Sequence, residues 1–299
     1  MGRSQPVPPG PAPRPPVQRL RVRFAKRGRL RFASHRDVAR AIERAARRTG
    51  LPVAFSAGFT PHPKISYAGA AATGVASEAE YFEIGLTSRC APGEVGERLD
   101  AALPAGLDVI DVAEAGGGSL ADDLQVSEWR VTLPGQPQEA VAAACREFMA
   151  TAWVEVERRT AKGIRRVDAR AAVIALELDR RAVDSVTGGC AILRMVVQHM
   201  TPAVRPDDVL AALRQVAGLA PPSPPLVTRL AQGPLGAAAS GFDEPGAAGS
   251  AAAGDGAAHS GAATGGAPAP ARWARAERRD QNAGSAASDG GAGPASADD

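Results

Sequence analysis

The residues of this sequence that are best suited to chemistry are basic, and they fall into three groups. The groups are Arg36, Arg40, Arg44, Arg47 and Arg48; His62 and Lys64; and Lys162, Arg165 and Arg166. The first group belongs to a stretch, residues 19–48, that contains twelve basic residues and two acidic ones. Positive groups clustered in this way attract phosphate, so we predict that these residues contact RNA or another phosphate-rich molecule. The alternative is an arginine-rich solvated face that has no ligand.

His62 has the clearest capacity for proton transfer. Its neighbours Pro61 and Pro63 restrict the backbone on both sides, which predicts a stiff loop. Because imidazole titrates near neutral pH, His62 is a candidate general acid or base, and His35 is the one histidine that we can place near it. The structural alternative is a turn in which the His62 ring packs on Phe59 or bonds to backbone.

Ser34 and Asp37 stand three residues apart just before an apolar helical pattern. We interpret them as helix caps, because a Ser-His-Asp triad is assembled in space and not from adjacent residues.

The cysteines, Cys90, Cys145 and Cys190, are too far apart for a cluster motif, so no metal or cofactor is expected. No apolar run is long enough to span a membrane, and no apolar signal segment follows the first arginines, which predicts a cytoplasmic protein.

The apolar periodicity predicts the elements that must position these residues. In the first half, alternation of apolar and basic residues predicts a strand at 20–24 that resumes at 30–32, and a stripe at 38–45 predicts a helix carrying the arginines. Further strands are expected at 53–55, 65–68, 82–86 and 107–112, and a helix at 95–103. The order is that of a β-α-β-β-α-β ferredoxin-like unit.

The second half repeats this pattern more weakly. Strands are expected at 129–133, 153–156, 174–178, 192–197 and 226–230, and helices at 141–148 and 206–213. A basic insertion at 162–170 lies between strands, and we expect its Asp168 to pair with an arginine. We therefore predict an α+β fold made of two tandem ferredoxin-like units.

Composition sets the expected boundaries. Residues 1–16 are rich in proline, and residues 231–299 are mostly Gly, Ala, Ser, Pro and Asp, so both are predicted to be disordered tails. The folded part is then 17–230, with the first unit at 17–115 and the second at 116–230.

Several motifs resemble one bacterial family, the radical-SAM-associated domain of unknown function. The resemblance rests on the segments 28–37, 51–52, 58–66 and 74–81, which include the serine-histidine and proline-histidine-proline motifs, and on a later match at 162–170. That family is found fused to, or encoded beside, a cobalamin-binding-type radical SAM protein. The resemblance implies an accessory role toward a separate radical SAM enzyme, because this chain lacks the three-cysteine cluster motif of such an enzyme.

Three functions follow from these observations. The chain is an accessory protein that binds RNA or another phosphate-rich substrate for a radical SAM partner. Alternatively it is an RNA-processing enzyme that uses His62 as acid or base, or a module whose arginines dock on an acidic protein surface.

Overall fold

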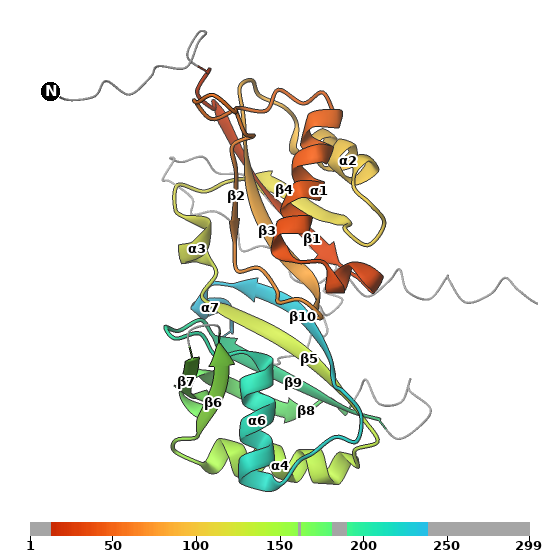
Figure 1. Cartoon of the computed structure of the whole chain (residues 1–299), viewed down its shortest axis with the longest axis vertical. Coiled ribbons are helices and arrows are strands. Elements are labelled where there is room, and N and C mark those ends of the chain that lie inside the picture. Colours follow the sequence, from red (N-terminus) through yellow and green to blue (C-terminus); the bar gives the residue numbers. More distant parts are fainter. Residues whose placement is uncertain (1–12, 161–162, 181–189, 239–299) are drawn as a thin grey trace, which may run out of the picture. The chain divides into compact units, whose positions relative to one another are not determined.

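A computed structural model describes residues 13–160, 163–180 and 190–238 of the chain, which fall in the compact unit Met1–Gly241. Of the tails predicted at 1–16 and 231–299, residues 1–12 and 239–299 lie outside the described residues, whereas 231–238 contribute to a strand and a short helix. Within them, strands and helices form a mixed α+β structure, as expected (Figure 1).

The first half contains two α-helices, one 3-10 helix and four strands. Its elements are β1 (Gln18–Lys26), the 3-10 helix η1 (Gly28–Phe32), α1 (His35–Arg48), β2 (Ile65–Ala68), β3 (Ala76–Leu86), α2 (Pro92–Ala102) and β4 (Val109–Glu114). The strands pair in the order β4-β1-β3-β2, and every pairing is antiparallel. Two predictions were wrong here: residues 30–32 belong to η1, and Val53 and Phe55 form only isolated bridges.

A short helix leads into the second half. Its strands and helices follow the same order along the chain as those of the first half, with an insertion between the first helix and the second strand. The elements are α3 (Leu120–Asp123), β5 (Val126–Pro134), α4 (Gln138–Ala150), β6 (Glu155–Thr160), β7 (Gly163–Asp168), α5 (Ala169–Ala172), β8 (Val173–Leu178), β9 (Cys190–Gln198), α6 (Pro206–Ala217), β10 (Leu226–Gly233) and α7 (Leu235–Ala238). Strands β10, β5, β9 and β8 pair in that order, all antiparallel.

The strand expected at 153–156 was predicted to belong to the main sheet of the second half, but it lies outside that sheet. Residues from Glu155 onward form β6, which pairs only with β7 in a separate two-stranded sheet. The described part of the basic insertion, 163–170, therefore forms β7 of this hairpin and the start of α5. At the C-terminal end β10 continues to Gly233, three residues beyond the expected boundary.

Each half has its own apolar core. In the first half Leu20, Val22 and Phe24 of β1 pack with the buried faces of α1 and α2. In the second half Trp129, Val131 and other residues of β5 pack with α4 and α6. The strict alternation along β1 and β5 explains this arrangement, because alternate side chains point to one face of a strand.

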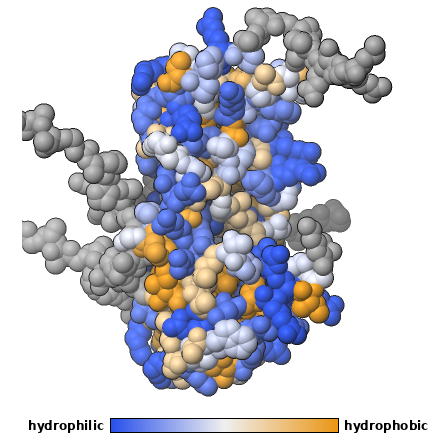
Figure 2. All heavy atoms as spheres, turned by 90° about the vertical axis from the view of Figure 1, so that its left-hand side faces the viewer, coloured by the Kyte–Doolittle hydropathy of each residue, from blue (hydrophilic) through white to orange (hydrophobic). Residues whose placement is uncertain are grey.

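The two halves are joined through one edge of each sheet. Strand β10 pairs in parallel with β3 at Thr228↔Ala76 and Arg229↔Ser77, so that the described residues form one eight-stranded sheet. We call this junction the seam. Figure 2 shows the face that bears α3 and the β6–β7 hairpin, on which apolar residues are interspersed with polar ones.

Candidate nucleic-acid interface

Helix α1 is the element that positions the first basic group. Ser34 caps it as predicted: its hydroxyl oxygen accepts a hydrogen bond from the Asp37 N–H at 3.2 Å and donates to the Asp37 carboxylate at 2.6 Å. The buried stripe consists of Val38, Ala41, Ile42, Ala45 and Ala46. Because this stripe faces the sheet, the arginines at the intervening positions lie on the solvent face.

The five arginines of α1 are not equivalent. Arg36, Arg40 and Arg44 are exposed, and none of them forms a hydrogen bond or ion pair with another described residue. The Arg47 guanidinium donates to the Pro61 carbonyl at 3.3 Å, and Arg48 donates to the Ala102 carbonyl at 2.6 Å. Three guanidinium groups, four residues apart, are therefore available to a ligand along one edge of the helix.

The His62 loop is held beside this helix. Besides its bond to Pro61, the Arg47 guanidinium lies over the Phe55 ring, 5.2 Å from the centroid. Ser56 closes the loop from the other side, since its N–H donates to the His62 carbonyl at 2.8 Å and its hydroxyl accepts from the His62 N–H at 3.1 Å. Arg47 thus brings the loop to the end of α1 that carries Arg44.

The side chains of this loop remain available. His62 and Lys64 are exposed. Neither side chain forms a hydrogen bond, ion pair or ring contact with a described residue, so both can contact a ligand. The backbone of Lys64 is fixed, because its N–H donates to the Ala54 carbonyl at 2.7 Å and its carbonyl accepts from Gly85 at 3.0 Å. A rigid backbone that presents an exposed lysine and an exposed imidazole is suited to binding an anion.

His35 lies in the first turn of α1 and packs on another partner. Its ring meets the Tyr67 ring edge to face, with 5.3 Å between centroids. Among the described residues, no hydrogen bond or ring contact joins His35 to His62. The two candidate acid-base residues are thus not in direct contact with each other.

The basic stretch 19–48 does not form one surface. Side chains alternate along β1, so its arginines lie on the sheet face opposite α1. Arg19 and Arg21 contact Glu83 at 3.8 and 3.0 Å, and Arg21 also contacts Asp123 at 2.7 Å. Arg19 and Arg21 are thus paired with carboxylates within the protein, whereas Arg36, Arg40 and Arg44 of the helix form an exposed basic row.

The third basic group lies in the second half. Arg165 and Arg166 are exposed on β7, and Arg166 is paired with Glu157 at 2.9 Å. Lys162 lies outside the described residues. The expectation for Asp168 was wrong: its carboxylate caps α5 by accepting the N–H groups of Arg170 and Ala171. Of the two residues of the third basic group that the structure describes, Arg165 is therefore the one without an ion pair.

Sequence reasoning missed two exposed aromatic residues that bracket α1. Phe32 in η1 is 58% exposed and Phe59 in the His62 loop is 65% exposed. Phe32 stacks with the Arg31 guanidinium, which lies 4.6 Å from its ring centroid. Exposed rings beside free arginines are the elements on which unpaired bases stack. The positions of Phe32 and Phe59 at turns could have indicated that they are exposed. The low overall content of aromatic residues argued against stacking on bases, so these two were not considered.

The described residues thus define an α+β protein with a basic helix edge, two exposed rings and a rigid histidine loop. The chain belongs to the family described as an uncharacterized protein conserved in bacteria (DUF2344), which matches residues 19–206. No curated protein matches the sequence.

A chain in the crystal structure of a Cbf5-Nop10-Gar1 complex is similar in structure, with a TM-score of 0.38 and 13% identity. The match covers 77% of this chain and 56% of that chain, so this protein spans little more than half of its length. Likeness of this degree identifies no function. Within the described part of the chain, every helix is too short or too polar to cross a membrane.

Proposed function

We propose that this protein binds single-stranded RNA, or another phosphate-rich strand, along the outer face of α1. The observation that carries the proposal is the row formed by Arg36, Arg40 and Arg44, which are exposed and form no hydrogen bond or ion pair with a described residue. The Asp37 carboxylate acts on Arg36 and Arg40 only through its charge. An exposed charge that is not paired within the protein can exchange its water and counterions for phosphate. Lys64 extends the positive surface at the end that Arg47 fixes, and the exposed His62 ring lies on the same loop.

The exposed rings favour a single strand over a duplex. Phe32 precedes the first turn of α1, and the loop with Phe59 is attached near its last turn. A fourteen-residue helix is about 21 Å long, so the arginine row connects the regions that carry the two rings. Rings can stack on unpaired bases while arginines hold the phosphates, but a duplex keeps its bases inside.

The proposed biological role is that of an accessory protein to a separate radical SAM enzyme. This part of the proposal rests on the sequence motifs around Ser34, His35 and His62 that resemble the radical-SAM-associated domain. We also propose that residues 17–115 and 116–230 are two ferredoxin-like units. The support is the same order of paired strands in both halves, interrupted in the second by the β6–β7 hairpin.

The test is RNA binding by the full chain, measured as fluorescence anisotropy of a labelled oligouridylate at several salt concentrations. We expect the double variant R40Q/R44Q to bind more weakly at low salt. Its plot of log K against log salt should also be shallower by about 1.4, at about 0.7 for each lost phosphate contact on a single strand.

The matched control is R146Q/R214Q, which removes two exposed helix arginines from α4 and α6 in the second half. It changes the net charge by the same amount, so it should weaken binding only slightly. Equal binding by wild type, R40Q/R44Q and the control would contradict the proposal.

The same preparation separates the two other hypotheses. If His62→Ala binds RNA normally but abolishes a cleavage activity seen with wild type, the protein is an enzyme. If R40E/R44E abolishes nuclease-resistant co-purification of a radical SAM protein while RNA binding is absent from wild type, the arginines form a protein-docking surface.

A further inference from the structure

The two exposed rings beside α1 differ in how firmly they are held. Phe32 is the last residue of η1, and the Arg31 guanidinium lies over its ring, 4.6 Å from the centroid. Phe59 lies in a loop, and no described residue forms a ring contact or a cation–π contact with it. Because a guanidinium is stacked on one ring and not on the other, Phe32 is the ring that is oriented before a ligand arrives.

The backbone beneath the Phe32 ring is fixed by hydrogen bonds on both sides. The Arg31 carbonyl accepts the Gly74 N–H at 2.8 Å, and the Ala33 N–H donates to the Leu30 carbonyl at 2.9 Å. A turn that is held in this way presents the Phe32 side chain in a defined direction.

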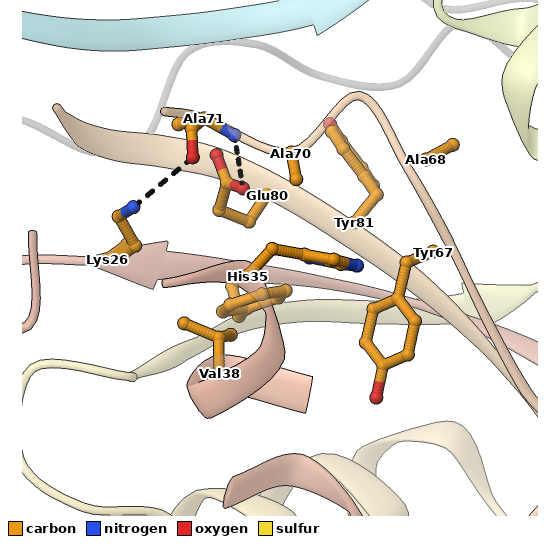
Figure 3. Close-up of a pocket in the computed structure, with 10 residues that line it drawn as sticks. Lys26, His35, Val38, Tyr67, Ala68, Ala70, Ala71, Glu80 and Tyr81 are labelled. Carbon is orange, nitrogen blue, oxygen red and sulfur yellow. Dashed lines mark hydrogen bonds between the residues drawn. The ribbon is translucent and has the colours of Figure 1, made fainter. Parts of the chain in front are cut away.

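The segment that carries Gly74 is anchored to the interior of the first half. Two buried charged residues bind the backbone of Ala71: Lys26 donates to its carbonyl at 3.3 Å, and Glu80 accepts its N–H at 3.0 Å (Figure 3). Lys26 is 2% exposed and Glu80 is 5% exposed. The bond from Gly74 to Arg31 therefore connects the ring to buried structure, so little conformational entropy should be lost when a ligand stacks on it.

The Arg31 guanidinium is not satisfied within the described part of the chain. Its Nε atom is buried and has no hydrogen-bond partner there, and the group forms no ion pair with a described residue. Arg27 in the preceding turn differs, because it is paired with Glu78 and, at 3.0 Å, with Asp108. A half-buried arginine without a carboxylate partner is suited to binding phosphate, whose oxygens accept its terminal N–H groups.

Arg31 and Phe32 lie at the beginning of the arginine row. Arg36 follows Phe32 by four residues, and four residues span at most about 14 Å. The helix then places Arg40 and Arg44 at successive steps of about 6 Å. A strand bound along the row and extended by a few nucleotides therefore reaches the Phe32 ring.

We propose that Phe32 and Arg31 form a nucleotide subsite at the first turn of α1, an inference that rests on the proposed function. One base stacks on the face of the Phe32 ring that Arg31 does not cover, and the Arg31 guanidinium binds a phosphate of the same strand. Stacking on an aromatic ring tolerates every base, so the ligand is a strand of any sequence whose bases are unpaired. Phe59 contributes less, because its ring must first be ordered.

The test is an anisotropy titration of the full chain with labelled oligouridylate at several salt concentrations. Phe32→Leu keeps an apolar side chain but removes the flat ring, so affinity should fall about tenfold while the slope of log K against log salt stays the same. Phe32→Trp should bind at least as tightly as wild type. Arg31→Gln removes one phosphate contact, so its slope should be shallower by about 0.7.

Phe59→Leu is the matched control, because it removes a ring of similar exposure, 65% against 58% for Phe32. It should weaken binding less than F32L does. Wild-type affinity in F32L, or an equal loss in F59L and F32L, would contradict the proposal.

A ligand without bases separates stacking from a general effect of the substitutions. Inorganic polyphosphate can occupy the arginine row but offers no base to the ring. F32L should therefore bind polyphosphate as wild type does, whereas R40Q/R44Q should bind it more weakly. If F32L loses affinity for polyphosphate as well, the ring acts on the structure of the row and the proposal is wrong.

The same titrations distinguish failure of the subsite from failure of the proposed function. If wild type binds neither oligouridylate nor polyphosphate, the proposed function fails and the subsite fails with it. If R40Q/R44Q weakens RNA binding while F32L and R31Q leave it unchanged, the proposed function stands and the subsite fails. If F32L and R31Q weaken RNA binding while R40Q/R44Q does not, the subsite stands and the arginine row does not contribute.

Discussion

Arg229 of β10 and Glu80 of β3 form an ion pair that is buried at the seam, with only 4% and 6% of their side chains exposed. The guanidinium also lies over the Trp129 ring at 5.2 Å and donates to the Ser77 hydroxyl at 3.3 Å. Because β10 and β3 share only two paired positions, this pair supplies much of the polar contact between the two halves.

Removing one partner of the pair should destabilise the protein strongly, because the other charge is left buried. We expect Arg229→Ala or Glu80→Ala to lower the free energy of unfolding by about 3–5 kcal/mol in urea titrations. The control is Glu94→Ala, which breaks the exposed pair with Arg98 on α2 and should cost about 0.5 kcal/mol or less. A loss below about 1 kcal/mol in R229A would show that the pair is not essential at the seam.

Gly69 should tolerate substitution by alanine less well than Gly28, although both glycines have a left-handed backbone. At φ +61° it needs glycine, and a Cβ there would lie 2.5 Å from the Gln232 side-chain oxygen and 3.3 Å from Leu124. Gly28 has a similar φ of +53° but open space around it. Gly28→Ala should therefore cost about 1–2 kcal/mol from backbone strain alone, and Gly69→Ala more, in the same urea titrations. Equal losses would show that the contact with Gln232 relaxes freely.

His199 should make stability depend on pH. Its Nδ1–H donates to the Leu124 carbonyl at 2.6 Å, which leaves Nε2 to accept the Ser127 hydroxyl at 2.7 Å. Burial lowers the pKa of His199 below its ordinary 6.5, the Leu124 carbonyl opposes this, and the charge of Arg229 adds to it.

As pH falls through 6.5, the unfolded chain binds the proton first, so this contribution to stability is complete above pH 6.5 and is lost toward the lowered pKa. His199→Gln should be less sensitive to pH in that interval when unfolding is measured between pH 5 and 7.5. If the free energy of unfolding of H199Q depends on pH as steeply as that of wild type, His199 is not the source of the pH dependence.

Arg47 should hold the His62 loop in place. Arg47→Ala removes both the bond to Pro61 and the contact with Phe55, so the amide protons of Ser56 and His62 should exchange faster with deuterium. Arg48→Ala is the control, since Arg48 bonds to the end of α2. Unchanged exchange in R47A would show that the Ser56 bonds suffice.

Much of the first half could be predicted from the sequence. The stripe from Val38 to Ala45 and the cap at Ser34 correctly predicted α1 and placed its arginines on the outer face, because both signals are local. The strand at 65–68 was predicted to the residue, whereas 30–32 was not, since a 3-10 turn and a strand can show the same short alternation.

The sequence by itself determined which faces of β1 and α1 are apolar and which are basic, since side-chain period follows directly from backbone geometry. Only the tertiary structure decided that Arg19 and Arg21 of β1 meet Glu83 and Asp123. It likewise decided that Arg36, Arg40 and Arg44 of α1 form no hydrogen bond or ion pair with a described residue. It also decided that Lys26, Glu80 and Arg229 are buried together. These groups are up to about two hundred residues apart in the chain, and their charges act through space once β10 lies against β3.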